Sequence, residues 1–116
     1  MLISEIIKEA QNRVPEVAPE AISSALDDYV VVDVREPQEV LHGYLPGAVN
    51  VPRGTIEFRM TEDPYLGNRG QAILIYSNAG ERSVLAALTL FQLGYSNVQS
   101  LAGGFGRWSR ERRPVA

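Results

Sequence analysis

The chain has 116 residues, 45% of them hydrophobic and 22% charged, with a formal net charge of −3 and no cysteine. Length and composition fit one ordinary globular domain, so we expect a single domain over residues 1–116. The acidic balance gives no electrostatic basis for nucleic-acid binding, and the lack of cysteine excludes disulfides, thiolate metal sites and a cysteine nucleophile. We expect neither a metal ion nor a cofactor.

Neither end of the chain indicates a membrane partner. No apolar run is long enough to span a bilayer, and charged residues interrupt residues 1–14, which lack the continuous apolar core of a secretory signal. We therefore expect a cytoplasmic protein. A basic run near the end is interpreted as a solvated helix turn and tail, with a docking patch as the alternative. Its members are Arg107, Arg110, Arg112 and Arg113.

Apolar periodicity predicts helices that alternate with β-branched, nearly uninterrupted apolar strands. In chain order, we expect a helix over 1–14, an extended segment over 16–18, a helix over 19–26, a strand over 29–34, a short helix over 36–42, a strand over 49–51, a short helix over 55–60, a loop over 61–70, a strand over 72–76, a helix over 83–93, a strand over 98–101 and a final helix from 103 onwards. This alternation predicts an α/β fold, with a parallel sheet covered by helices on both faces.

Single residues predict where several of these helices begin and end. Ser4 is the candidate cap of the first helix, and Pro15 ends it. Pro19 suits the first position of the second helix. Gly43 and Gly94 are expected to end the helices that precede them.

The junction after the 72–76 strand carries the most informative pattern in the chain, residues 77–83 (SNAGERS). Ligands of open parallel sheets bind beyond the carboxyl ends of the strands, and a loop that enters a helix N-terminus there presents backbone N–H groups and a positive dipole to an anion. Gly80 supplies the backbone freedom of a tight loop, and Arg82 supplies a planar charged group. The alternative is a plain strand-to-helix turn that contains a serine.

Four segments, in order, resemble the rhodanese family. Residues 33–36 (DVRE) and 43–52 (GYLPGAVNVP) resemble its D-V-R-E and G-H-I-P-G-A-x-N-I-P elements. The 77–83 loop is similar to its active-site loop C-x-x-G-x-R-S, and residues 101–105 (LAGGF) with Trp108 resemble its closing L-x-G-G element and aromatic. The resemblance covers about residues 17–110 and implies a single rhodanese-like domain.

The resemblance also implies a chemistry. In the family, a cysteine thiolate at the position of Ser77 takes the outer sulfur of thiosulfate or a similar donor, holds it as a persulfide and passes it to cyanide or to a small or protein thiol. Four residues separate Ser77 and Arg82, as in the sulfur-transferring members, whereas related phosphatases and arsenate reductases have one more. The site residues implied are Ser77 and Arg82 as the catalytic positions and Asn78, Ala79, Gly80, Glu81, Arg82 and Ser83 as the anion-binding loop.

Serine at position 77 does not fit that chemistry. Its hydroxyl is un-ionised at neutral pH without an activating base, and a hydroxyl has no counterpart of a stable persulfide. We therefore expect the chain as given to be inactive. One hypothesis is a sulfurtransferase whose nucleophile has been changed to serine, favoured because the rest of the loop keeps the active pattern. The other is a naturally cysteine-free module that binds a partner or an anion.

Charged residues outside the loop have two interpretations each. Asp33 and Arg35 are expected to form an ion pair that braces the sheet beside the loop, with contact between Arg35 and a ligand as the alternative. His42, the only histidine, is interpreted as a helix-terminal or surface side chain rather than a base for Ser77. Glu81 is expected to point to solvent, since an inward carboxylate would repel an anion.

Three further side chains are assigned structural roles. Tyr44 stands where the family commonly has histidine and is expected to contribute packing. Arg53 is expected on the surface, with the rim of the site as the alternative. Phe105 and Trp108 are expected in the core.

Overall fold

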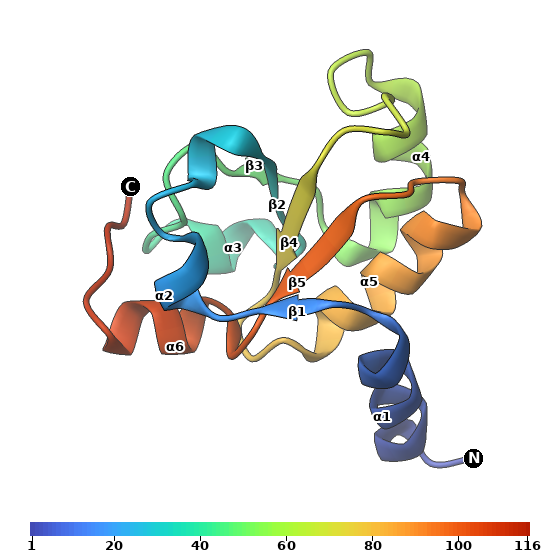
Figure 1. Cartoon of the computed structure of the whole chain (residues 1–116), viewed down its shortest axis with the longest axis horizontal. Helices are drawn as coiled ribbons and strands as arrows, with labels where there is room; N and C mark the ends of the chain where they lie inside the picture. The colour runs from blue at the N-terminus through green and yellow to red at the C-terminus, as the bar shows by residue number, and fades with distance from the viewer.

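Figure 1 shows the computed structural model, which describes residues 1–116. Its centre is a five-stranded sheet in the order β1-β5-β4-β2-β3, in which every neighbouring pair is parallel. The strands are β1 (Glu16–Val17), β2 (Val30–Asp33), β3 (Val49–Asn50), β4 (Ile73–Tyr76) and β5 (Val98–Leu101). The α-helices are α1 (Ile3–Arg13), α2 (Pro19–Ile22), α3 (Pro37–Val40), α4 (Ile56–Glu62), α5 (Glu81–Gln92) and α6 (Gly104–Arg110), and the 3-10 turns are η1 (Leu26–Asp28) and η2 (Arg53–Thr55).

Alternate side chains of the central strands enter two separate cores, one on each face of the sheet. In β4, Ile73 and Ile75 belong to the larger core, which includes buried residues of α1, α4 and α5. Leu74 and Tyr76 belong to the smaller core, which includes Ile22 of α2 and Trp108 of α6. Because β4 is buried on both faces, it needs an apolar residue at nearly every position. The predicted α/β fold is confirmed.

The chain order reverses between β2 and β4. From β2 the chain continues to β3 on one side, whereas from β4 it continues to β5 on the other side. Such a switch point opens a crevice at the carboxyl ends of the two strands, where open α/β sheets bind ligands. The segments that leave these two strands begin at Val34 and Ser77, so both sequence elements singled out above meet at this edge.

Several predicted helix bounds differ from the structure. α3 ends at Val40, three residues before Gly43, α4 extends to Glu62 inside the predicted loop, and α5 begins at Glu81 instead of residue 83. The second helix ends at Ile22 instead of Leu26, because Ser23 and Ser24 are weak helix formers and Ala25 leaves helical backbone geometry before η1. Ser4 does not cap α1: Leu2 occupies the cap position, and no side chain bonds the first turn. Gly94 does end α5, at a left-handed φ of +95° that lets the Tyr95 N–H bond back to the Leu90 carbonyl.

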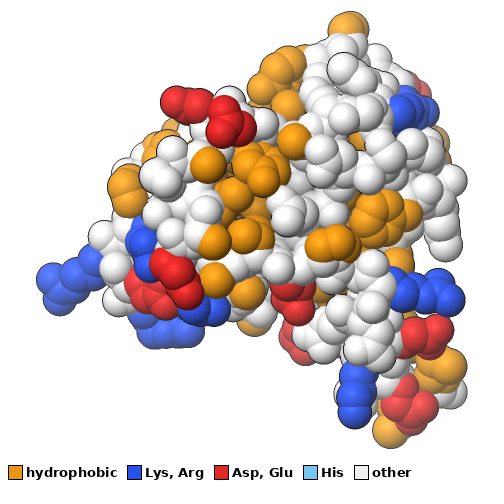
Figure 2. Space-filling view, in the orientation of Figure 1, with side chains coloured by type: hydrophobic (Ala, Val, Ile, Leu, Met, Phe, Trp, Pro, Cys, Tyr) orange, Lys and Arg blue, Asp and Glu red, His pale blue; other side chains and the backbone are white.

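The basic run near the C-terminus does not form a purely positive surface. Arg107 pairs with Glu20 and Glu111, and Arg113 pairs with Glu111. Figure 2 shows acidic and basic side chains mixed in the region of α6, and a similar mixture along α1. This pairing favours the solvated-surface interpretation over a docking patch. None of the helices combines the length and the apolar character needed to cross a bilayer.

Candidate functional site

The Ser77 side chain lies under the loop that joins β4 to α5. Its residue is 1% exposed, and its Oγ accepts hydrogen bonds from the N–H groups of Gly80 at 3.1 Å and Ser83 at 3.2 Å. Gly80 has a φ of +100°, a left-handed conformation that L-residues rarely adopt. This conformation folds the loop back over position 77, and the atom at that position therefore receives two backbone donors.

Within residues 78–82, four N–H groups donate to no protein acceptor. They belong to Asn78, Ala79, Glu81 and Arg82. Free N–H groups are expected at a helix N-terminus, and here they add to the positive end of the α5 dipole. Asn78, Ala79 and Glu81 are exposed residues, so a ligand from solvent can approach this part of the loop. The loop thus offers free donors at its surface and occupied donors beneath.

The N-terminus of α6 holds the loop from behind. The N–H of Phe105 donates to the Ser77 carbonyl at 2.8 Å, and the N–H of Gly106 donates to the Asn78 carbonyl at 2.9 Å. A Cβ at Gly104 would overlap the Ser77 carbonyl oxygen, and Gly104 also has a φ of +60°. Only glycine fits this approach, which gives a physical reason for the second glycine of the 101–105 segment.

Arg82 is engaged by a carboxylate of α3. Its two terminal nitrogens each donate to Glu39 at 2.8 Å, and this pair is about one-third exposed. The hydrogen bonds from Arg82 lower the pKa of Glu39 to about 2, and burial of the carboxyl opposes them only in part. The pKa of Arg82 is raised, chiefly by the same bonds. Arg82 therefore joins the loop to α3 and is not a free cation over the loop.

A second, fully buried group lies at the end of β2. The guanidinium of Arg35 contacts Asp33 at 2.7 Å and donates to the Gly43 carbonyl at 2.8 Å. Asp33 also accepts from the Tyr76 hydroxyl at 2.6 Å. The Arg35 guanidinium lies 4.3 Å from the centre of the Phe105 ring. Asp33 and Arg35 thus form the bracing ion pair expected from the sequence.

The pKa values in this network follow from burial and from the Asp33 charge. Burial raises the pKa of Tyr76 far above its ordinary value, and the hydrogen bond to Asp33 raises it further. Burial alone would lower the pKa of Arg35, but the hydrogen bonds and charge of Asp33 outweigh it, so the net pKa is raised. Tyr76 therefore stays neutral and Arg35 stays charged across the physiological range.

No base contacts Ser77. His42 is exposed in the turn after α3, whereas the Ser77 hydroxyl is buried and makes its side-chain contact with Ser83 Oγ at 3.3 Å. Glu81 is exposed, as expected for a carboxylate directed to solvent. Activated serine chemistry lacks its general base here.

The remaining side chains have structural surroundings. Arg53 reaches Thr89 and Glu57 on the surface. Tyr44 is partly exposed, and its carbonyl accepts from the Ala116 N–H. Trp108 is fully buried, and Phe105 packs against the smaller core.

Three residues beside the loop have contacts that the sequence did not predict, although Gly104 belongs to the 101–105 segment singled out above. They are Glu39, Gly104 and Ser100, whose hydroxyl lies 2.9 Å from Ser83 Oγ. Glu39 offered one weak signal, since it lies three residues after Glu36 and their reciprocal bonds form a capping box on α3. Ser100 offered none, because a serine in a strand is compatible with many roles.

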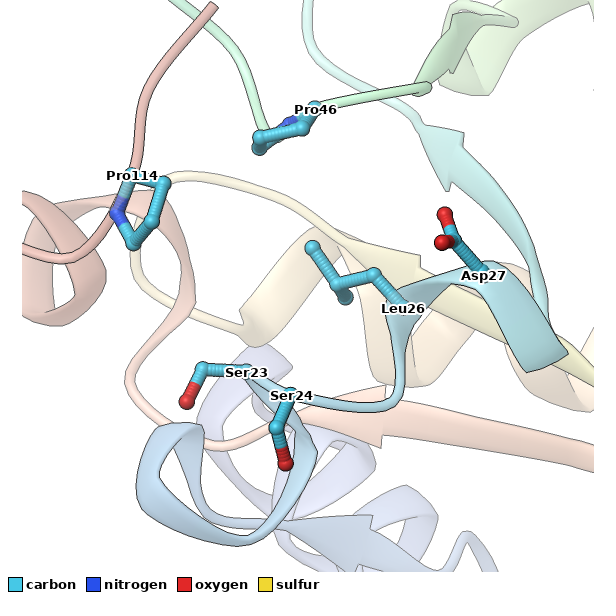
Figure 3. A pocket seen from close by; sticks show the side chains of 6 residues that line it. All are labelled: Ser23, Ser24, Leu26, Asp27, Pro46 and Pro114. Atoms are coloured by element: carbon cyan, nitrogen blue, oxygen red, sulfur yellow. The ribbon is translucent and has the colours of Figure 1, made fainter.

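A shallow depression of about 180 Å³ lies elsewhere on the surface (Figure 3). It is lined by Ser23, Ser24, Leu26, Asp27, Pro46 and Pro114. No residue of the 77–83 loop contributes to it, and its lining holds no cluster of titratable side chains. The 77–83 loop therefore remains the candidate site.

The fold and the 77–83 loop define a small α/β domain with backbone donors gathered at the switch point of a parallel sheet. A family model for the rhodanese-like domain matches residues 18–111, and the chain belongs to that family. A sulfurtransferase of Allochromatium vinosum is 35% identical over 105 residues, covering 88% of this chain and 94% of that protein.

Two further similarities agree with this family. Thiosulfate sulfurtransferase 16, chloroplastic, of Arabidopsis thaliana is 30% identical over 92 residues, covering 72% of this chain and 77% of that protein. A structure from Rhodopseudomonas palustris superposes with a TM-score of 0.90 at 29% identity, covering 100% of this chain and 95% of that one. That protein is of unknown function and is described as a possible tyrosine phosphatase.

Proposed function

We propose that this chain is a rhodanese-family sulfurtransferase domain with serine at the nucleophile position. In this form it binds small sulfur-containing anions such as thiosulfate at the 77–83 loop and transfers no sulfur. The observation that carries the proposal is the environment of Ser77 Oγ, which accepts two backbone N–H groups while four neighbouring N–H groups stay free. Such donors stabilise negative charge both at position 77 and on a ligand above it.

The proposed transfer has two displacements. A thiolate at position 77 attacks the outer sulfur of thiosulfate, an S–S bond forms, and sulfite leaves with the electron pair of the broken S–S bond. Cyanide or a thiolate acceptor then attacks the bound outer sulfur, and the thiolate at position 77 is released. Ser77 supports neither step, since its hydroxyl is not ionised and forms no persulfide.

The alternative is a naturally cysteine-free rhodanese module that binds a partner or an anion. Both hypotheses predict no turnover by the chain as given, and codon 77 of the gene distinguishes an introduced serine from a natural one. They differ in the response to Ser77→Cys. A retained catalytic loop gains transfer, whereas a loop adapted only to binding does not.

The direct assay is thiocyanate formation from thiosulfate and cyanide. The chain as given should match the uncatalysed rate, and Ser77→Cys should exceed it clearly. Ser96→Cys is the matched control, because Ser96 is exposed and lies outside the loop, so its thiol lacks the backbone donors. Turnover by the chain as given, or equal rates for the two cysteine variants, would contradict the proposal.

Arg82 has a testable role within this proposal. Because both of its terminal nitrogens are bound by Glu39, we expect Arg82 to act as a brace. Adding Arg82→Ala to Ser77→Cys should lower thermal stability and leave KM for thiosulfate within about twofold. A rise in KM of an order of magnitude at unchanged stability would show instead that Arg82 holds the donor.

Weak anion binding by the chain as given is the remaining test. The loop donors are backbone groups, so they do not depend on the side chain at position 77. Crystals soaked in thiosulfate should show the anion within hydrogen-bond distance of the free N–H groups of residues 78–82. An ordered loop without an anion at high thiosulfate concentration would contradict the proposed site.

A further inference from the structure

Three buried hydroxyls lie in a row beneath the loop. Ser77 Oγ and Ser83 Oγ are 3.3 Å apart, and Ser83 Oγ and Ser100 Oγ are 2.9 Å apart. Ser77 is 1% exposed, and Ser83 and Ser100 are fully buried. The row connects position 77 to the interior of β5, a strand that contributes no residue to the loop.

The protons of this row can be assigned from the available acceptors. Ser83 Oγ donates to the Gly80 carbonyl at 3.1 Å and accepts from Ser77. The hydroxyl of Ser100 has Ser83 Oγ as its hydrogen-bond partner. If Ser83 donated to Ser100, the Ser100 proton would be buried without an acceptor, which is unfavourable. Ser100 is therefore the donor and Ser83 the acceptor.

An anion at position 77 changes this arrangement in one way only. It has no proton to give to Ser83, so the Ser83 hydroxyl rotates to donate to it. The Gly80 carbonyl keeps a hydrogen bond from the Val84 N–H at 3.3 Å, so the rotation does not leave it unpaired. Ser100 continues to donate to Ser83, and a hydroxyl that accepts one hydrogen bond is a stronger donor in the next.

We propose that Ser100 is a positioning residue for the nucleophile: by donating to Ser83 Oγ, it directs the Ser83 hydroxyl to the atom at position 77 and stabilises negative charge there. This inference rests on the proposed function, in which that atom is a thiolate. Neither the position of Ser100 in the 98–101 strand nor the loop sequence indicated such a role. Ser100 touches neither donor nor acceptor and acts through Ser83.

The charged groups around position 77 do not replace this effect. Arg35 is paired with Asp33 at the end of β2, and Arg82 is paired with Glu39 of α3. Glu81 on α5 is exposed, and α6 presents the N–H groups of Phe105 and Gly106 to the loop carbonyls. None of these side chains hydrogen-bonds Ser77 Oγ, whose side-chain partner is Ser83.

The test measures the pKa of a thiol at position 77, from the pH dependence of its alkylation by iodoacetamide. The chain has no other cysteine, so the Ser77→Cys variant reports a single site. Adding Ser83→Ala should raise that pKa by about one unit, and adding Ser100→Ala should raise it by about half a unit. With Ser83 already replaced by alanine, Ser100→Ala should add nothing, since its effect passes through Ser83.

Matched variants separate the hydroxyl from packing. Ser100→Thr and Ser100→Val have nearly the same shape and both suit a strand, but only threonine keeps the hydroxyl. In the Ser77→Cys background, we expect the threonine variant to retain the low pKa and the valine variant to lose part of it. The comparison of Ser100→Thr with Ser100→Val still tests the role of the Ser100 hydroxyl if Ser100→Ala fails to fold. Ser96→Ala, at an exposed position, should leave the pKa unchanged.

The outcomes distinguish this inference from the proposed function. A low thiol pKa in Ser77→Cys that is equal in the threonine and valine variants would overturn the role of Ser100 alone. An effect of Ser100→Ala that persists with Ser83→Ala would overturn the route through Ser83. An ordinary thiol pKa without sulfur transfer would contradict the proposed function, and the role of Ser100 would then stand only if Ser100→Ala still raised that pKa.

Discussion

The carboxyl ends of β2 and β4 are neighbours in the sheet, where Asp33 pairs in register with Tyr76. The polar groups that follow the two strands differ in whether they have partners within the protein. After β2, the buried charge of Arg35 is matched by Asp33 and by the Gly43 carbonyl. After β4, four backbone N–H groups within residues 78–82 donate to no protein acceptor. The charged groups of the first region are paired within the protein, whereas the second region has hydrogen-bond donors available for a ligand.

The region after β2 is therefore a structural support, and the region after β4 is the candidate binding site. The Asp33–Arg35 pair carries the charges that the sequence makes most noticeable, yet its hydrogen bonds join β2 to Tyr76, to α3 and to the segment after α3. The 77–83 loop has no free positive charge of its own, since Arg82 is bound by Glu39 and the other charged residue, Glu81, is an exposed carboxylate. Its capacity to bind an anion lies in backbone groups and the helix terminus.

The largest loss of stability should come from breaking the Asp33–Arg35 ion pair. Asp33→Asn leaves the Arg35 guanidinium buried without its counter-charge, and we expect the free energy of unfolding to fall by about 3 kcal/mol or more. Urea denaturation measures it, and Asp28→Asn, at an exposed position, should change stability little. A small loss of stability for Asp33→Asn would show that water or another carboxylate compensates the charge of Arg35, and that Asp33 is not its essential partner.

The next largest loss of stability should come from replacing Gly104, the glycine that lets α6 approach the loop. Gly104→Ala places a Cβ against the Ser77 carbonyl at a left-handed φ, and we expect a loss of about 2 kcal/mol in stability. Gly54→Ala is its control, since a Cβ there meets no atom within 4 Å. Equal stability of the two variants would show that the loop can move away from α6 without cost.

A smaller and pH-dependent loss of stability is expected when the ion pair between Glu39 and Arg82 is broken. The pKa of Glu39 is lowered from 4.5 to about 2, so its pair with Arg82 stabilises the fold above pH 4.5 and loses this contribution as the pH falls toward 2. Because the pair is partly exposed, Glu39→Gln should cost less than about 1 kcal/mol at neutral pH.

The pH profile is the informative part of that comparison. The stability difference between the chain as given and Glu39→Gln should be constant near neutral pH and should shrink between about pH 4.5 and pH 2. Thermal unfolding across this range measures it. Glu57→Gln is the control, since Glu57 lies 3.9 Å from Arg53 in a longer ion pair and is more exposed than Glu39. A difference that grows toward acid pH would contradict the assigned pKa shift.

The sequence was most informative where burial dominates. The apolar runs over 29–34 and 72–76 predict β2 and β4 to within about one residue, because strands buried on both faces allow few polar side chains. The Asp33–Arg35 pair was predictable because the two residues share one strand end. The helix over 19–26 was not, since weak helix formers after Ile22 and the turn into β2 override its periodicity.

Contacts between distant segments account for what the sequence did not reveal. Glu39 and Arg82 are 43 positions apart, and Ser83 and Ser100 are 17 apart, so no local pattern indicates either pair. The requirement for glycine at position 104 depends on the path of the Ser77 backbone beside it. Such features follow from the assembled sheet, in which β4 and β5 bring their following segments together.

Intact-mass measurement of Ser77→Cys shows whether the 77–83 loop takes up and releases sulfur once it carries a thiol. Incubated with thiosulfate and freed of excess reagent, the variant should gain the mass of one sulfur atom and lose it when cyanide is added. The chain as given should show no change in either step. A folded Ser77→Cys protein whose mass never changes, under conditions where an unrelated rhodanese acquires sulfur, would contradict the account of the 77–83 loop as a sulfur-transfer site lacking only its thiol.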